Sequence, residues 1–217
     1  MIKAVIFDFD GTLMNTLPGI AHFGNTALAE IGLAPVEEEK YKYFVGNGRD
    51  KLIHRMLDFY GADTPENFEI VGKKYDSLYE GDVMYGSVIY DGIPELLDSL
   101  RSAGIKTAML SNKPDNVAQM LIEKNFCGKF DICYGQRYGV PTKPNPAAAL
   151  EIAEFVKASP EECMFVGDTN VDVSTGKNAG MHTVGVLWGF RGKDELEDAE
   201  FIAAVPKDIA NAVKKIK

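Results

Sequence analysis

Short runs of consecutive apolar residues, many of them β-branched, recur along the chain at intervals that suit strands. The clearest are 4–7, 105–110, 163–167 and 182–187. Continuous apolarity, in place of an alternation of apolar and polar positions, is typical of strands covered on both faces. These four runs therefore predict a parallel sheet.

Helical patterns lie between the predicted strands. In 93–104, Leu96, Leu97 and Leu100 fall on one helical face, and Gly104 follows as a suitable left-handed terminator. A further helix is predicted to begin with Asn145 as its N-cap and Pro146 at its first position. Proline is tolerated there because an N–H at that position has no acceptor within the helix. Alternating strands and helices predict an α/β fold with a doubly wound sheet.

Residues 17–84 break this alternation. They contain no convincing strand, but four helical segments occupy 19–32, 36–44, 48–61 and 65–79. We expect a helical cap domain at 17–84, inserted into a catalytic core of residues 1–16 and 85–217. Ligand sites often lie between two such lobes.

Composition narrows the classes of partner. The chain has 217 residues and a net charge of −9, which argues against nucleic acid because phosphate backbones need clustered Lys and Arg. Its three cysteines lack metal-type spacing, and no apolar span reaches 18 residues. We expect a cytoplasmic protein with a small-molecule partner and no membrane association.

The first predicted strand ends in two carboxylates and a glycine. Asp8 and Asp10 stand two residues apart at the carboxyl end of the run, so on a strand they point to the same face. Gly11 allows a tight turn toward a ligand, and Thr12 offers a hydroxyl for phosphate. The alternative is an ordinary Asp-Gly turn, which leaves Asp8 in an apolar run without a purpose.

A second acidic cluster follows the predicted strand at 163–167. Asp168 ends that strand and Asp172 stands four residues on, the spacing of neighbours on one helical face. Carboxylates that converge from both strands would repel one another without a cation, and hard oxygen ligands suit Mg²⁺. Taken alone, this cluster could equally be a loop with a helix cap.

Two further segments supply candidate phosphate ligands. Ser111 and Asn112 follow the strand at 105–110, just ahead of a helix opened by Pro114, so a hydroxyl and helix N-terminal amides meet there. Lys143 precedes another helix and could neutralise phosphate oxygens. Each is unremarkable in isolation, since Ser-Asn is a common cap and a loop lysine is usually solvated.

With DFDGT, SN, K and GDTNVD in this order, the chain resembles the haloacid dehalogenase superfamily, and the resemblance covers nearly its whole length. It implies a Rossmann-like core with an inserted helical cap. It also implies that Asp8 is the nucleophile, forming an aspartyl-phosphate, and that Asp10 is the acid and base. Asp8, the Asp10 carbonyl and Asp168 would ligate Mg²⁺, with Asp172 as an outer ligand or orienting group. Ser111 and Lys143 would hold the phosphoryl group.

Within the superfamily, the carboxylate at Asp10 favours phosphatases or mutases over dehalogenases. VGNGRDKLI at 45–53 and VLWGFRGKDEL near the end are similar to phosphoglycolate phosphatase-like members. Gly46, Asn47 and Arg49 would form a cap loop that selects the substrate, with Arg49 reading an anionic group. The alternative for this stretch is a helix cap with a solvated arginine.

The family pattern commonly has Asp-Ser or Asp-Thr after the first motif, whereas this chain has Asn15 and Thr16. This departure keeps a pyrophosphatase open as an alternative to a phosphomonoester phosphatase. Two further alternatives stay open independently of it: a β-phosphoglucomutase-like mutase, which would share the aspartyl-phosphate, and a receiver-like module phosphorylated on Asp8. We expect a monomer or a homodimer.

Overall fold

The computed structural model describes residues 1–216, and within them six strands form one parallel sheet. Their order is β5-β4-β1-β6-β7-β8, which in chain order is the 3-2-1-4-5-6 arrangement of Rossmann-type sheets. The strands are β1 (Ala4–Phe7), β4 (Lys106–Pro114), β5 (Ile132–Gln136), β6 (Cys163–Gly167), β7 (His182–Val186) and β8 (Phe201–Ala203).

Helices cover both faces of the sheet. Val5 and Phe7 of β1 belong to the same apolar cluster as α5 (Ile93–Ser102), α6 (Asp115–Asn125) and α9 (Pro206–Lys215). Ala4 and Ile6 pack instead with α7 (Ala147–Phe155), and α8 (Asn170–Asn178) lies against β6 and β7. Because β1 is buried on both faces, its sequence is a continuous apolar run. Short 3₁₀ helices occupy Pro160–Glu162 and Lys193–Leu196.

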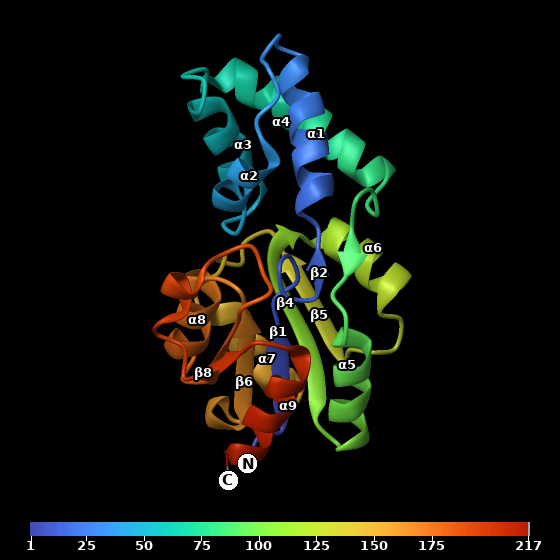
Figure 1. The fold of residues 1–217 in the computed structure, drawn as a ribbon, viewed down its shortest axis with the longest axis vertical. Coiled ribbons are helices and arrows are strands. Elements are labelled where there is room, and N and C mark those ends of the chain that lie inside the picture. Colours follow the sequence, from blue (N-terminus) through green and yellow to red (C-terminus); the bar gives the residue numbers. More distant parts are fainter. Residues whose placement is uncertain (217) are drawn as a thin grey trace.

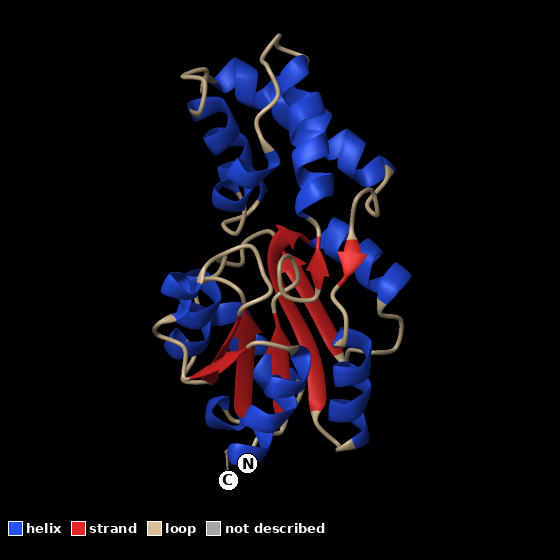
Figure 2. Cartoon of the chain, viewed as in Figure 1, coloured by secondary structure: helices blue, strands red, loops and turns tan. Residues whose placement is uncertain are grey.

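A helical lobe stands above the carboxyl ends of the strands (Figures 1 and 2). It consists of α1 (Leu17–Ala29), α2 (Glu38–Phe44), α3 (Arg49–Asp58) and α4 (Pro65–Gly81). Where the chain enters and leaves the lobe, β2 (Met14–Asn15) pairs with β3 (Val88–Ile89) in antiparallel fashion. The predicted α/β core with an inserted α-helical cap is confirmed, and we propose 17–84 as the extent of the cap domain.

The sheet is larger than the apolar runs predicted. The edge strand β5 is mostly only half-buried, so ICYGQ lacks the continuous apolarity of a covered strand. β4 continues to Pro114 through an irregularity after Leu110, so Ser111 and Asn112 lie within its distorted end and do not follow it. The helix expected at Asn145 begins at Ala147, whose N–H donates to Asn145 Oδ1 at 3.0 Å.

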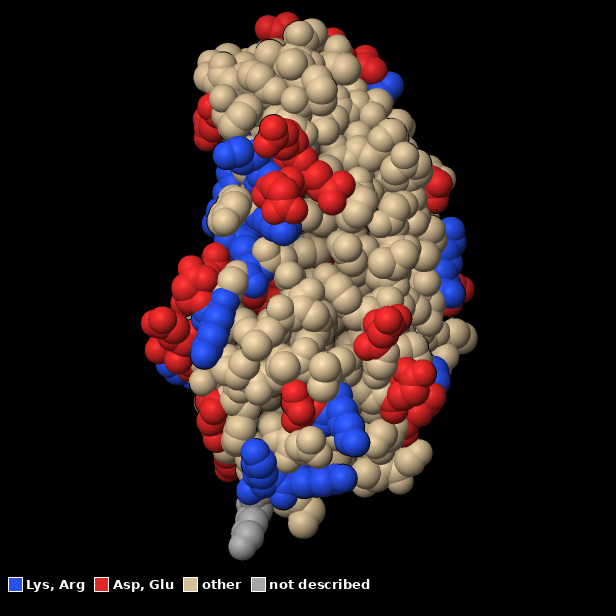
Figure 3. Space-filling view, in the orientation of Figure 1, with Lys and Arg blue, Asp and Glu red and all other residues tan. Residues whose placement is uncertain are grey.

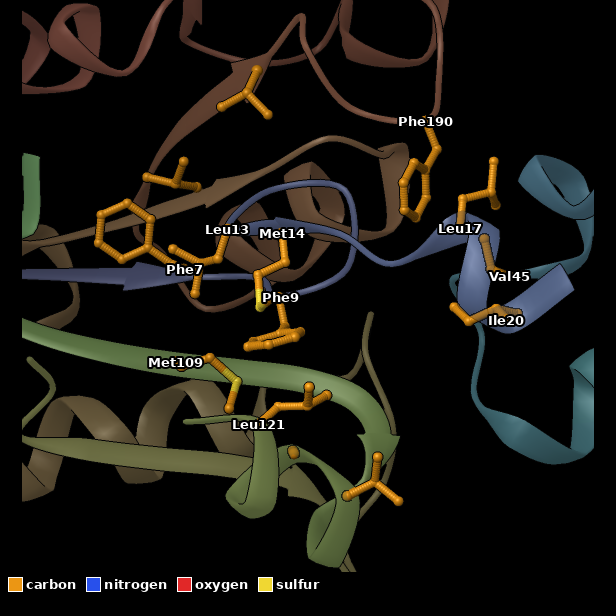
Figure 4. Close-up of a cluster of buried hydrophobic side chains, with 14 of the residues drawn as sticks. Phe7, Phe9, Leu13, Met14, Leu17, Ile20, Val45, Met109, Leu121 and Phe190 are labelled. Atoms are coloured by element: carbon orange, nitrogen blue, oxygen red, sulfur yellow. The ribbon is translucent and has the colours of Figure 1, made fainter. Parts of the chain in front are cut away.

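The apolar core extends from the sheet into the helical lobe. Figure 4 shows Phe9, Met109 and Leu121 beside the sheet, and Phe190 close to Leu17 of α1. All belong to one cluster of buried residues. The lobe is therefore packed onto the core at this point, which positions its inner surface over the strand ends. Among residues 1–216, no helix has the length and apolar content needed to cross a membrane.

Candidate active site

A cavity of about 210 Å³ lies between the helical lobe and the carboxyl ends of the strands. It sits beside β1 and β6, where the direction of strand order reverses, the usual ligand position in doubly wound sheets. Both parts of the molecule line it. The core contributes Asp8, Asp10, Ser111, Lys113, Lys143 and Asp172, and the lobe contributes Gly46, Gly48, Arg49, Tyr75 and Tyr79.

Asp8 is held by a buried lysine. Its backbone N–H donates to Val166 O at 2.8 Å, so the sheet ladder continues one residue past β1 and fixes the position of the side chain. Lys143 Nζ donates to Asp8 Oδ1 and to Asp172 Oδ1, both at 2.6 Å. No donor in residues 1–216 is bonded to Asp8 Oδ2, which leaves that oxygen open for chemistry.

Three buried carboxylates converge here. One oxygen from each of Asp8, Asp168 and Asp172 lies within 4.8 Å of the other two. Asp168 Oδ2 accepts the Phe190 N–H at 2.8 Å. Asp172 Oδ2 accepts both the backbone N–H and the hydroxyl of Thr169, which caps α8. The expected convergence of the two acidic segments is therefore present, and local hydrogen bonds orient each carboxylate.

The cluster holds more negative than positive charge, and this shifts the pKa values of its members. Burial, together with the charge of Asp172, raises the pKa of Asp8 to about 7, although Lys143 opposes the shift. Burial, together with the charges of Asp172 and Asp8, raises the pKa of Asp168 well above its usual range. Burial lowers the pKa of Lys143, but Asp172 and Asp8 outweigh it and hold that pKa above its ordinary value. One ammonium among three carboxylates leaves room for a further cation.

Asp10 lines the same cavity but has different partners. Its Oδ1 accepts the hydroxyl of Thr16 at 2.6 Å, and its Oδ2 lies 3.2 Å from Lys113 Nζ. The strand spacing predicted that Asp8 and Asp10 would converge on one point. β1 ends at Phe7, however, and the turn carries the Asp10 side chain away from the three-carboxylate cluster.

Gly11 makes this turn possible. Its φ of +85° is in the left-handed region, and a Cβ at this position would overlap the carboxylate of Asp168. Thr12, predicted to offer its hydroxyl to phosphate, instead points at Asp168 Oδ1 at 3.5 Å and is fully buried. Neither residue is among those that line the cavity, so their part is to shape the loop around Asp168.

Ser111 and Asn112 differ in what they present to the cavity. The Ser111 hydroxyl accepts the Lys113 N–H at 3.2 Å, so its own proton remains available to a ligand. Asn112 Oδ1 accepts the Lys143 N–H at 2.8 Å, while its Nδ2 donates to the carbonyls of Lys143 and Gly46. Its side chain therefore braces Lys143 and the cap, and the residue also lines the cavity, so phosphate binding by Asn112 stays a prediction.

The cap loop is docked on the core. Besides the Asn112 contact, Arg191 of the core reaches Val45 O at 3.4 Å, while Arg55 holds the loop within the cap by donating to Phe44 O at 2.9 Å. Figure 3 shows Lys and Arg side chains gathered on the edge where the lobe and the core meet. Of the three predicted cap residues, Gly46 and Arg49 line the cavity; Asn47 does not, because its side chain accepts from Arg55.

Arg49 is already paired. It forms two hydrogen bonds with Asp76, at 2.9 Å and 2.7 Å, and a third with Asp50 at 2.9 Å. The prediction that Arg49 reads an anionic substrate group is thus weakened, because two carboxylates neutralise the guanidinium.

Sequence reasoning missed three residues of the site: Thr16, Tyr79 and Lys113. Thr16 and Lys113 contact Asp10, and Tyr79 contacts Lys113. Lys113 directly follows the Ser111-Asn112 motif, so its position in the sequence could have marked it as a site residue. Nothing in the sequence around Tyr79 marks it, because only the folded cap brings α4 to the site.

Comparisons with known proteins agree with this geometry. Residues 2–180 match the family model described as haloacid dehalogenase-like hydrolase. A phosphoglycolate phosphatase of Rhodospirillum rubrum is 33% identical over 197 residues, which cover 88% of this chain and 81% of the relative. That of Aquifex aeolicus is 31% identical over 209 residues, which cover 96% and 95%.

A solved structure, described as a predicted phosphoglycolate phosphatase of Haemophilus somnus, matches with a TM-score of 0.91 at 26% identity, covering 97% of each chain. The chain belongs to the haloacid dehalogenase-like hydrolases. Within them it is phosphoglycolate phosphatase-like, and the prediction of an enzyme of the phosphatase class is confirmed by these relatives.

Proposed function

We propose that the protein hydrolyses a small phosphomonoester, of the size and charge of phosphoglycolate, through an aspartyl-phosphate on Asp8 and with Mg²⁺ as its cofactor. The observation that carries the proposal is the placement of Asp8 at the cavity floor, with one oxygen on Lys143 and the other open. The names of the relatives support the choice of substrate class.

The residues present fit a divalent cation. Asp8, Asp168 and Asp172 bring hard oxygen donors within 4.8 Å of one another, and burial and mutual repulsion raise the pKa values of Asp8 and Asp168. Asp8 and Asp168 would hold Mg²⁺ together with the Asp10 carbonyl, and Asp172 would orient them. The ion, when bound, supplies positive charge for the phosphoryl oxygens.

The chain's own groups perform the transfer in two steps. The open oxygen of Asp8 attacks phosphorus, the ester P–O bond breaks, and Asp10 gives its proton to the leaving oxygen. Water then attacks the phosphorus of the aspartyl-phosphate and passes a proton to Asp10, which releases inorganic phosphate and restores Asp8. Lys143 and the Ser111 hydroxyl hold the phosphoryl oxygens, since phosphoryl transfer depends mainly on positioning and charge.

Thr16 gives Asp10 its orientation. Its hydroxyl holds Asp10 Oδ1 at 2.6 Å, while Asn15 Oδ1 accepts the Leu17 N–H at 3.2 Å at the start of α1. The departure from the family's Asp-Ser or Asp-Thr pattern therefore falls on a residue with a capping role, which asparagine fills as well as aspartate. This contact pattern favours retention of the phosphatase chemistry.

Phosphate release from a panel of esters tests the proposal. With Mg²⁺, we expect the highest kcat/KM for small anionic monoesters such as 2-phosphoglycolate, and little release without the metal. Preference for pyrophosphate would identify a pyrophosphatase instead. An isomerised sugar phosphate would identify a mutase, and a stable phosphorylated protein without turnover a receiver-like module.

Mg²⁺ should stabilise the protein in a pH-dependent manner. The folded-state pKa of Asp8 is about 7 against an ordinary 3.8, so the folded state holds a proton that the unfolded state has lost between these values. Metal-free stability therefore falls as pH rises from about 4 to 7. Mg²⁺ at a hundredfold excess over Kd adds about 2.7 kcal/mol, or roughly 5–10 °C in Tm, at pH 8, and much less at pH 5.

Thermal unfolding with and without Mg²⁺ at the two pH values measures this effect. The test variant is Asp168→Asn, which replaces a charged carboxylate ligand by a neutral carboxamide and should lose most of the shift at pH 8. Equal shifts at pH 5 and pH 8, or a full shift in the variant, would count against a metal at these carboxylates.

A further inference from the structure

We propose that Lys113 determines substrate specificity by binding a carboxylate on the leaving group, within a few bonds of the oxygen that is released. This inference rests on the proposed phosphatase function and names the substrate class of the same site. It assigns to Lys113 the anion recognition that the sequence placed on Arg49.

Lys113 is a buried cation that faces the cavity. Its side chain is 4% exposed, and the residue lines the cavity floor beside Asp10. Its Nζ donates to Tyr79 Oη at 2.7 Å and lies 3.2 Å from Asp10 Oδ2. A buried ammonium needs charged or hydrogen-bonding partners on all sides, because burial without them is costly.

The charge balance distinguishes the two cap-side cations. Arg49 has two carboxylate partners, one of them bidentate. Lys113 has one carboxylate partner, Asp10, which also accepts from Thr16, and one neutral partner, Tyr79. An ammonium carries three N–H donors, and within residues 1–216 no hydrogen-bond acceptor beyond Asp10 and Tyr79 is paired with Lys113 Nζ. Lys113 is thus the cation with capacity left for an anion.

Position limits the length of the substrate. Asp10 protonates the leaving oxygen in the proposed mechanism, so that oxygen lies near the Asp10 carboxyl. Lys113 Nζ is 3.2 Å from the same carboxyl, and its ligand must therefore follow the leaving oxygen closely. A carboxylate on the adjacent carbon meets this condition, whereas a longer chain carries its anion past Lys113.

The outer part of the cavity disfavours a distant anion. Asp76 and Glu80 line it there; Asp76 is held by Arg49, and Glu80 accepts from Asn116 at 2.6 Å. An anionic group that reached them would meet like charge. Tyr79 adds a second donor near Lys113, because its Oη accepts from Lys113 and keeps its own proton. Burial, with the charge of Asp10, holds the pKa of Tyr79 well above its usual range.

The test compares two esters that differ only in charge: 2-phosphoglycolate and 2-phosphoglycolamide, in which a carboxamide replaces the carboxylate. The quantity measured is the ratio of their kcat/KM values, with Mg²⁺ present. We expect the wild type to favour the carboxylate, and Lys113→Met to lower the ratio by about tenfold to a hundredfold. General damage to folding or catalysis affects both esters and cancels in the ratio.

Tyr79→Phe is a second variant that keeps Lys113 and removes its anchoring hydroxyl; it should lower the ratio by about threefold to tenfold. Lys51→Met, which changes an exposed lysine of α3, should leave the ratio unchanged, and Arg49→Met should change it less than Lys113→Met. A wild-type ratio near one, or a ratio that falls with Arg49→Met and not with the Lys113 and Tyr79 variants, overturns the assignment. No phosphate release from any ester overturns the proposed function itself, and the inference with it.

Discussion

Asp8→Asn is expected to lower phosphate release by about ten-thousandfold or more, because an amide oxygen cannot serve as the nucleophile. The substitution is nearly isosteric, and the amide oxygen can still accept from Lys143, so the fold should be retained. Removal of one of three crowded carboxylates should even stabilise the metal-free protein at pH 8, where Asp8 is ionised. Steady-state kinetics and thermal unfolding measure the two effects.

The matched control is Asp58→Asn on the exposed surface of α3. We expect it to leave both the activity and the stability unchanged. An Asp8→Asn protein that kept even a hundredth of the wild-type rate would exclude Asp8 as the nucleophile.

Lys143→Met should impair both activity and stability. The substitution removes the ammonium that binds Asp8 and Asp172 at 2.6 Å each and leaves their carboxylates buried without it. Loss of one partner of a buried ion pair costs about 3–5 kcal/mol, and loss of an electrostatic contact to the reacting group lowers kcat by about a hundredfold to a thousandfold.

The loss of stability should depend on pH. At pH 5, below the raised pKa of about 7, Asp8 is protonated in the metal-free folded protein, so Lys143 contributes less there than at pH 8. Urea unfolding of metal-free protein at the two pH values measures the difference. Lys124→Met, an exposed lysine of α6, is the control. An equal loss at both pH values would show that the contribution of Lys143 to stability does not depend on the ionisation of Asp8.

The elements that sequence patterns predicted are those with a strong local signal. β1, β6 and β7 are covered on both faces, so nearly every residue in each strand is buried and the sequence shows a continuous apolar run. The buried carboxylate of Asp8 could be located because it interrupts such a run, and a charged residue at the end of a covered strand is unexpected for packing alone. Helix α5 combines a regular apolar stripe with a glycine at its end.

Contacts between distant segments could not be predicted. Asn112 braces Gly46 across 66 positions, and Lys113 meets Tyr79 across 34. The sequence shows both donors but not which acceptors the folded cap brings to them. For Thr12, the hydroxyl was visible, but its direction depends on how the loop at Gly11 turns around Asp168.

The edges of the sheet were missed for a related reason. β5 lies at one edge and β8 at the other, and each has residues that contact solvent. β5 (ICYGQ) is mixed in polarity, and β8 (FIA) is apolar but only three residues long. Neither sequence therefore gives a continuous or alternating pattern long enough to predict a strand. Only pairing with β4 and β7 defines them as strands.

Trapping of the covalent intermediate tests the central claim most directly. Borohydride reduces an acyl phosphate to an alcohol, so quenching the enzyme during turnover of 2-phosphoglycolate with Mg²⁺ would convert a phosphorylated aspartate to homoserine. Mass spectrometry of the peptide that contains residues 4–16 locates the change. We predict homoserine at position 8 in the wild type and none without substrate. Sustained turnover with position 8 unmodified, or with the modification on another aspartate, would contradict the account.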